Sequence, residues 1–231
     1  MLEQSKEYLA AVKSPQRQVD AKFTLNNRVY TGTQLAKLYY DQAIVSGTSY
    51  TFGGAYVAGL TVEIKELVEG LMEMMPATAE IGISVDDAME YKPIGQFFVK
   101  DIELDRNTNS TKLKLQDGFC KLNGEYQSRL SYPTTARAVF SEICQICNIS
   151  TMPMNIPDTI ILGTKLEKTS YREAIQYIAQ LVGSYAIFNR KGQLEFRNIQ
   201  KLSYRVNRDN YVMGGFKRKE IKFRLHGVEC E

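Results

Sequence analysis

The sequence predicts an α+β fold in which a β-rich part comes first and a smaller part with helices and a hairpin follows. Between residues 17 and 115, short segments alternate apolar and polar side chains, as half-buried strands do. After residue 117, two segments instead repeat apolar residues at helical spacing. We therefore expect a β-rich domain at 1–116 and an α+β domain at 117–199. Residues 200–231 should form strands that rejoin the first domain or begin a further one.

The first part begins with a short helix, since residues 1–13 carry apolar side chains at helical spacing and Pro15 ends the segment. A helix of this length is marginal alone, so it should dock on another element. The alternation in Arg17–Leu25 predicts a strand, Asn26-Asn27 a turn, and Val29–Thr31 the return strand. The chain therefore opens with a helix and a hairpin.

More strands follow in the first part. Gln34–Tyr40 is apolar but ambiguous, and Gly53, Gly54 and Gly59 indicate a bend between strands, because they lack the spacing of a phosphate-binding loop. Several short strands at this density indicate a barrel or a sandwich. The clearest further strands are Leu60–Ile64, Ala79–Val85, Tyr91–Asp101 and Thr111–Leu115.

A methionine-rich segment, Gly70–Met75, separates two of these strands. Filling of the core is the preferred interpretation, because methionine adapts to irregular gaps. The alternative is a flexible apolar surface that meets a partner, formed by Met72, Met74 and Met75.

The second part contains two helices and a hairpin. Thr135–Cys147 predicts the first helix, and Ser170 with Glu173 forms the capping-box pattern that starts the second. Gly183 sits where a left-handed C-terminal cap is expected. A hairpin should follow at once, with Tyr185–Phe188 as its first strand, a loop at Asn189–Gly192, and Leu194 and Phe196 in its second strand.

Composition excludes several classes of protein. Hydrophobic residues make up 44% and charged residues 24%, which is an ordinary globular balance. The net charge of +3 does not indicate a nucleic-acid partner, and the small basic cluster Lys217–Lys219 is interpreted as a solvated turn. No signal sequence or long apolar run is present, so we expect a soluble protein made in the cytoplasm, without membrane insertion.

The four cysteines do not form a metal-binding pattern. Cys144 and Cys147 make a CxxC inside a predicted helix, and only Cys120, Cys230 and His226 remain as further soft or imidazole ligands, far along the chain. We expect buried thiols that pack as small hydrophobes, no metal site and no cofactor.

Catalysis is not expected. The single histidine leaves little room for a nucleophile–base site, and no P-loop, HExxH or G-x-S-x-G motif occurs. The carboxylate pairs Asp86-Asp87 and Glu63 with Glu66 could in principle serve glycoside hydrolysis. Acidic residues on solvated turns are far commoner, so no catalytic residue is assigned.

An ordered series of segments resembles one family. The segments are VKDIELDRNTNSTKLKLQDGFCKLNGEY at 99–126, SYPTTARAVFSEIC at 131–144 and SYREAIQYIAQLVGSYAIFNRKGQLEFRNI at 170–199. Together they are similar to the baseplate or tail-tip hub proteins of long-tailed phages and phage-tail-like particles, the XkdQ/YqbQ-like proteins and the N-terminal part of tail-associated lysins.

The resemblance implies a tube-type β-barrel at 1–116 followed by an α/β domain. It implies a structural protein of the virion tail tip, a homotrimer that contacts the tail tube or distal tail protein, the tape measure protein and a central spike or tip, with DNA only in passage. About thirty residues remain after 199, too few for the second tube domain of the family. We expect a shortened hub, or final strands that complete an earlier domain, and no peptidoglycan-cleaving domain.

Two alternatives come from other classes. A cell-wall-degrading tail lysin component would need a catalytic acid or metal site. A nucleic-acid-binding β-barrel would need basic and aromatic residues interleaved on one face, and the chain offers Lys217–Lys219 with Phe216 and Phe223. We also expect that residues lining any channel formed by the first domain are acidic or neutral, because basic ones would hold passing DNA.

Overall fold

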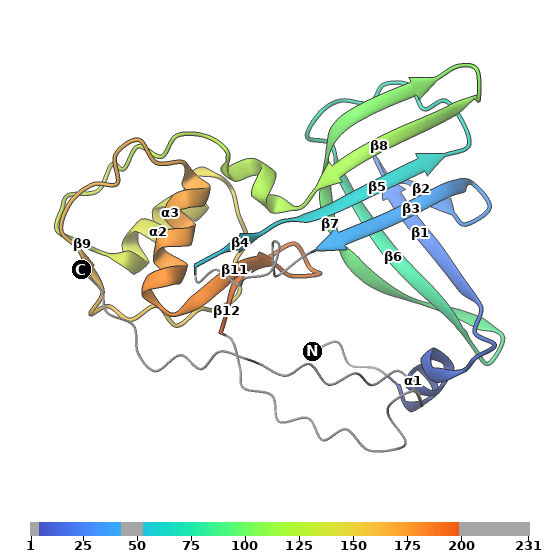
Figure 1. Cartoon of the computed structure of the whole chain (residues 1–231), viewed down its shortest axis with the longest axis horizontal. Helices are drawn as coiled ribbons and strands as arrows, with labels where there is room; N and C mark the ends of the chain where they lie inside the picture. The colour runs from blue at the N-terminus through green and yellow to red at the C-terminus, as the bar shows by residue number, and fades with distance from the viewer. Residues whose placement is uncertain (1–4, 43–52, 199–231) are drawn as a thin grey trace, which may run out of the picture. The chain divides into compact units, whose positions relative to one another are not determined.

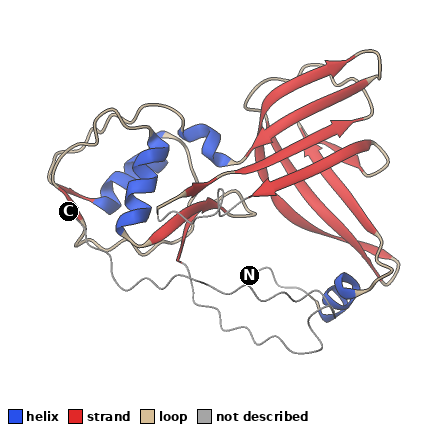
Figure 2. Ribbon diagram, viewed as in Figure 1, coloured by secondary structure: helices blue, strands red, loops and turns tan. Residues whose placement is uncertain are grey.

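The structure is a computed structural model that describes residues 5–42 and 53–198. These residues belong to one compact unit that ends at Asn198. The strands expected at 200–231 lie outside the described residues. Strands dominate, with three α-helices among the described elements, which agrees with the α+β class (Figure 2).

The largest element is a seven-stranded antiparallel sheet in the order β2-β1-β6-β7-β8-β5-β3. Its longest strand, β7, runs 18 residues and contains the whole of the predicted strand Tyr91–Asp101. All but the first residue of Gln34–Tyr40, ambiguous in sequence, belongs to strand β3. The bounds are β1 Val19–Leu25, β2 Arg28–Thr31, β3 Leu35–Gln42, β5 Ala58–Ile64, β6 Pro76–Val85, β7 Ala88–Asp105 and β8 Ser110–Gln116.

The sheet must curl, because its two edge strands are neighbours in the chain. Residues 32–34 alone join β2 to β3, a connection that reaches about 14 Å at most. Six strand spacings of about 4.8 Å would separate the edges by about 29 Å in a flat sheet. The strands therefore wrap around a core (Figure 1). No pairing joins β2 to β3 in the described residues, so the sheet does not close by backbone hydrogen bonds.

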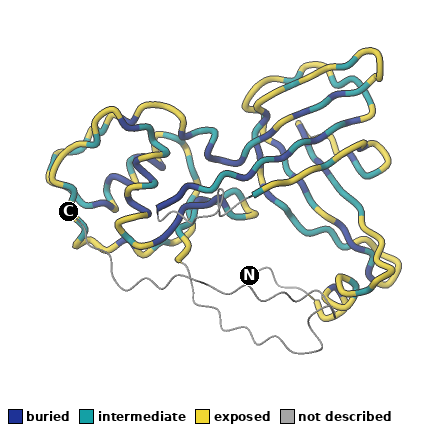
Figure 3. Tube along the Cα trace, in the orientation of Figure 1, coloured by how far each residue is buried: buried dark blue, intermediate teal, exposed yellow. Residues whose placement is uncertain are grey.

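The concave side of the sheet holds the first hydrophobic core. Strand β5 shows the cause, since its residues alternate strictly between buried and half-buried positions. Leu60, Val62 and Ile64 face inward together with Phe23 and Phe97, all at most 1% exposed. Figure 3 shows this alternation along neighbouring strands. The apolar residues that alternate with polar ones in the sequence thus form the buried face of the sheet.

Helix α1 (Lys6–Lys13) docks on the long β6–β7 hairpin, as expected for a helix that is too short to be stable alone. Ser5 caps it by accepting a hydrogen bond from the Tyr8 backbone N–H, at 3.0 Å. Tyr8 is buried against Ile83 and Val85 of β6. The hairpin turn itself is Asp86-Asp87, both with positive φ.

The second core lies between two helices and a three-stranded sheet of order β12-β11-β4. Helix α3 begins with the predicted capping box of Ser170 and Glu173, and Gly183 has the expected positive φ of 68°. Two apolar helix residues, Ile146 and Leu181, are 40% and 51% exposed, because each lies at the border of its helix's buried stripe. The elements are α2 Ala136–Ile146, α3 Tyr171–Leu181, β11 Ser184–Phe188 and β12 Leu194–Asn198.

Strand β4 (Ala55–Tyr56) corrects an expectation. The glycine-rich stretch was expected to be only a bend, and Gly53 does have a positive φ. The two residues after Gly54, however, pair in parallel with Ala186 and Ile187 of β11. A piece of the first part therefore joins the sheet of the second part. Such a short parallel pairing has no local sequence pattern.

Asp117 ties β8 to the short 3-10 helix that follows (Gly118–Leu122) and to β5. Its carboxylate accepts hydrogen bonds from the backbone N–H of Ala58 at 2.8 Å and of Phe119 at 3.1 Å. The residue is 2% exposed, and this burial raises the pKa of the Asp117 carboxyl to about 7, against the lowering effect of the two N–H groups and of Arg172.

Glu142 of α2 anchors the loop before the helix. Burial tends to raise the pKa of this carboxyl, but the hydrogen bonds that it accepts outweigh burial and hold the pKa below its usual value. Three groups donate to it: the Tyr126 hydroxyl at 2.6 Å, the Ser128 hydroxyl at 2.9 Å and the Arg129 backbone N–H at 2.8 Å.

Candidate functional site

The convex face of the sheet carries an ordered set of charges, which we call the charge ladder. Lys37 of β3 lies opposite Glu63 of β5, Glu63 lies opposite Lys112 of β8, and Lys112 lies opposite Glu103 of β7. Charges therefore alternate in sign from one strand to the next. Opposite charges in directly facing positions favour this register over a shifted one.

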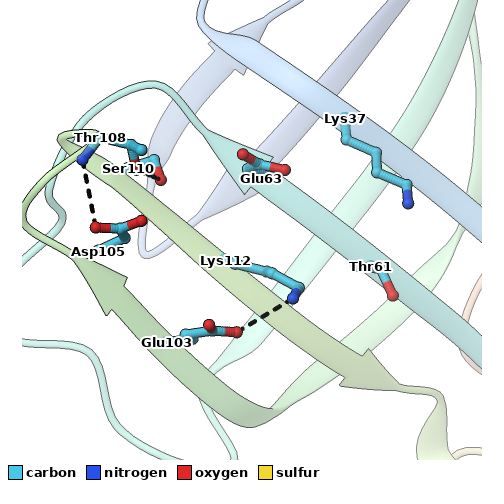
Figure 4. Close-up of a pocket in the computed structure, with 8 residues that line it drawn as sticks. All are labelled: Lys37, Thr61, Glu63, Glu103, Asp105, Thr108, Ser110 and Lys112. Atoms are coloured by element: carbon cyan, nitrogen blue, oxygen red, sulfur yellow. Dashed lines mark hydrogen bonds and ion pairs between the residues drawn. The ribbon is translucent and has the colours of Figure 1, made fainter.

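The ladder lines a groove of about 330 Å³ on this face (Figure 4). Thr61, Thr108 and Ser110 contribute hydroxyl groups between the charged side chains. At one end, hydrogen bonds from Thr108 and from the backbone N–H of Asn107 lower the pKa of Asp105, so this carboxylate stays ionised. All eight residues that line the groove have polar or charged side chains, which is unlike the mostly apolar lining of a small-molecule pocket.

Two ion pairs join β7 to β8 on this face. Lys112 Nζ lies 3.1 Å from Glu103 Oε2, and Lys114 Nζ lies 3.1 Å from Asp101 Oδ2. All four side chains are exposed, so each pair contributes little to stability. The surface is therefore better suited to displaying charge than to holding the sheet together.

The sequence contains the signal for this ladder, although it was not used to predict a site. The run KDIELD at 100–105 alternates acids with apolar residues, and the run TKLKL at 111–115 alternates lysines with apolar residues. A hairpin turn between two such strands places the acids opposite the lysines. What the sequence does not show is which strands lie beside this hairpin.

The methionine-rich segment lies in the loop between β5 and β6, and the core interpretation is wrong for two of its residues. Met72 is 64% exposed and Met74 is 42% exposed, whereas Met75 packs against the first core. The segment is tied to β7, because the Met74 backbone N–H donates to the Val99 carbonyl at 2.8 Å. One of the two exposed methionines, Met74, is therefore held beside Val99 of β7, four residues before Glu103 of the charge ladder.

The carboxylate pairs considered for catalysis have separate places. Asp86 and Asp87 form the exposed turn of the β6–β7 hairpin. Glu63 belongs to the ladder, and Glu66 pairs instead with Arg28, whose Nη2 lies 2.7 Å from Glu66 Oε1. The structure brings neither pair to a cavity.

Three free cysteines belong to the described residues, and two of them, Cys120 and Cys147, are half-buried. Cys144 is buried, and burial raises its thiol pKa to about 12, which agrees with thiols that pack as hydrophobes. In the residues that the structure describes, no three acidic, histidine or cysteine side chains are placed to hold a metal ion. Lys217–Lys219, His226 and Cys230 lie outside the described residues.

Helices α1 to α3 are too short and too polar to cross a membrane, and the described residues contain no other α-helix. No protein-family model and no curated protein matches the sequence. Solved structures do match in fold.

The chain is similar to the 43 kDa tail protein of prophage MuSo2 from Shewanella oneidensis, with 10% identity, 80% of this chain and 56% of that chain covered, and a TM-score of 0.54. It is similar to a tail protein from Neisseria meningitidis MC58, with 9% identity, 77% and 51% covered, and a TM-score of 0.52. A chain of the Francisella PdpA-VgrG complex matches with 11% identity, 82% and 29% covered, and a TM-score of 0.51.

The chain thus spans about half the length of the two tail proteins, and less of the third. At these identities the likeness concerns the fold. It covers about four fifths of this chain, which includes more than the curled sheet alone. The expected relationship to phage tail proteins is therefore confirmed at the level of the fold.

Proposed function

We propose that this protein is a structural baseplate or tail-tip hub of a long-tailed phage or phage-tail-like particle. The observation that carries the proposal is the fold shared with solved phage tail proteins over most of this chain. In this role the chain joins the tail tube to the central spike or tip and is part of the virion. It acts by assembly and has no catalytic activity.

The architecture supports a role in assembly. The curled sheet has edges at β2 and β3, and closing it into a barrel would need only contacts between these neighbouring strands. Three copies around the tail axis, with the tube or distal tail protein above, the spike below and the tape measure protein inside, would surround a channel. Residues 1–116 would act as the tube-type domain and 117–199 as the α/β domain.

The charges of the convex sheet face suit a channel that DNA passes without being held. Five acids and four lysines lie on the outward face of the four strands of the ladder, counted in β7 from residue 100 onward, so the face is not basic overall. Phosphate would be attracted to a basic face and would bind it in a salt-dependent way. The acids are Asp41, Glu63, Asp101, Glu103 and Asp105, and the lysines are Lys37, Lys100, Lys112 and Lys114.

The proposal is tested by placing the protein in the particle. Antibody labelling of intact tails should give label at the tail tip, and light scattering of the purified protein at high concentration should give about three chains per particle. Label along the whole tail, or none on the tail, would overturn the hub assignment. Clearing of cell walls in a zymogram would instead favour a lysin component.

A further inference from the structure

Strand β7 continues beyond one of its two partners. Pairing with β6 ends where Pro76 lies opposite Phe98, and Val99 exchanges hydrogen bonds with the loop residues Met74 and Met75. Pairing with β8 continues to Asp105. In the described part of the chain, residues Lys100–Asp105 therefore have a strand on one side only.

This segment, which we call the β7 edge, is open to solvent. Lys100, Asp101, Glu103 and Leu104 are all exposed, and Leu104 is 47% exposed despite being apolar. An open edge offers backbone N–H and C=O groups to any strand that can pair with them. Charged side chains limit which strands can do so, because like charges in facing positions repel.

The charge ladder indicates which strand would be accepted. Each step of the charge ladder places a charge opposite its counter-charge, and the last row, on β7, carries the acids Asp101, Glu103 and Asp105 after Lys100. A strand added beyond this row would place its own side chains beside these acids. Lys112 and Lys114 contact two of the acids from the β8 side, and an exposed carboxylate can accept from both sides. The added strand should therefore be basic on this face.

The opposite face of the added strand should be apolar. Ile102 of the β7 edge packs against the first core, and Leu104 points to the same face because side chains in a strand alternate. Met74, bonded to Val99 at the start of the edge, is 42% exposed, and Met72 is 64% exposed. Methionine side chains adapt to varied apolar partners.

We propose that Lys100–Asp105 of β7 is a docking edge for a β-strand of another protein chain, in which basic residues alternate with apolar ones. The strand extends the sheet by main-chain hydrogen bonds, and its basic residues select for the acidic row. This deepens the proposed function, on which it rests, because it names the contact through which the hub would bind a neighbouring chain in the tail.

The test uses the full chain and a labelled peptide of alternating lysine and valine, with binding followed by fluorescence anisotropy. Two control peptides are an alternating glutamate–valine peptide and one of the same composition as the probe with its lysines clustered. We expect the alternating basic peptide to bind more tightly than both controls. Equal binding of the clustered peptide would overturn the proposal, because it would show charge attraction without strand pairing.

A double variant, Asp101→Asn with Glu103→Gln, removes the charge while keeping the size of both side chains. We expect the affinity for the basic peptide to fall by about two- to thirtyfold, as two exposed ion pairs provide. The control is Glu90→Gln at the other end of β7, where Glu90 pairs with Lys92 at 3.3 Å and β6 occupies the neighbouring position. A control loss as large as that of the double variant would contradict the proposed site.

Hydrogen exchange locates the contact directly. We expect the bound peptide to slow exchange of amides within Lys100–Asp105 and to leave β3 unaffected. Protection of β3 and not of the β7 edge would overturn the proposal, and so would the absence of peptide binding. Labelling of the tail tip remains a separate test, so failure of the docking edge and failure of the hub role are distinguishable.

Discussion

Asp117 should make the stability of the protein fall as the pH rises from about 4 to about 7. Its folded pKa of about 7 lies about three units above the ordinary value of 3.8. The folded chain therefore keeps a proton in this interval that the unfolded chain has lost, and stability decreases with pH wherever the folded state binds more protons. At 1.36 kcal/mol per unit, the full effect is on the order of 4 kcal/mol.

Asp117→Asn isolates this contribution, because the amide has nearly the same shape and does not titrate. The amide has one acceptor oxygen, so one of the N–H groups of Ala58 and Phe119 loses its partner. We expect the variant to be less stable than the natural chain at pH 5 by about 1–3 kcal/mol. The deficit should shrink or reverse by pH 8, where the natural chain carries a buried charge.

Urea unfolding followed by circular dichroism at several pH values measures both free energies of unfolding. Their difference is the informative quantity, because carboxyls with lowered pKa values, such as those of Glu142 and Glu173, cancel in it. A difference that stays constant between pH 4.5 and pH 8 would refute the reasoning, since it would mean that burial does not displace the titration of Asp117.

Three further substitutions test local features by urea unfolding. Gly118→Ala would place a Cβ against the Phe188 ring, at a separation no real Cβ shows, so we expect the free energy of unfolding to fall by about 1–3 kcal/mol. The control is Gly163→Ala, where no atom lies within 4 Å of the added Cβ, and its stability should change little. Glu142→Gln should cost about 1–3 kcal/mol by weakening the anchor of loop 126–129, with faster hydrogen exchange there and unchanged exchange in β5. Ser170→Ala should cost about 1 kcal/mol of stability through loss of the capping box. Ser170→Asp can still cap the helix and should recover most of this stability. Equal losses in the two variants would show that capping is not the cause.

Elements with local causes could be predicted from the sequence. The capping box at Ser170, the left-handed cap at Gly183 and the turn at Asn26-Asn27 each depend on residues within one or two turns of chain. The strands that line the first core were predicted by period-2 alternation for the same reason. The exposed methionines could not be predicted, because exposure depends on what packs against the loop and composition does not encode that.

The candidate site likewise has one part that the sequence predicts and one part that it does not. The alternation of acids and lysines in 100–115 is a property of the sequence, and the hairpin that aligns them follows from it. The open edge of β7 does not follow from the local sequence. It depends on β6 beginning opposite Phe98, and no residue of β7 determines where another strand starts.

By itself the sequence determined where most strands and helices form and which of their faces are apolar, because those features depend on neighbouring residues. Only the tertiary structure decided which strands pair. It placed β4 beside β11, brought β2 and β3 to adjacent edges of a curled sheet, and buried Asp117 where these parts meet. These outcomes depend on contacts between residues far apart in the chain, which no local pattern specifies.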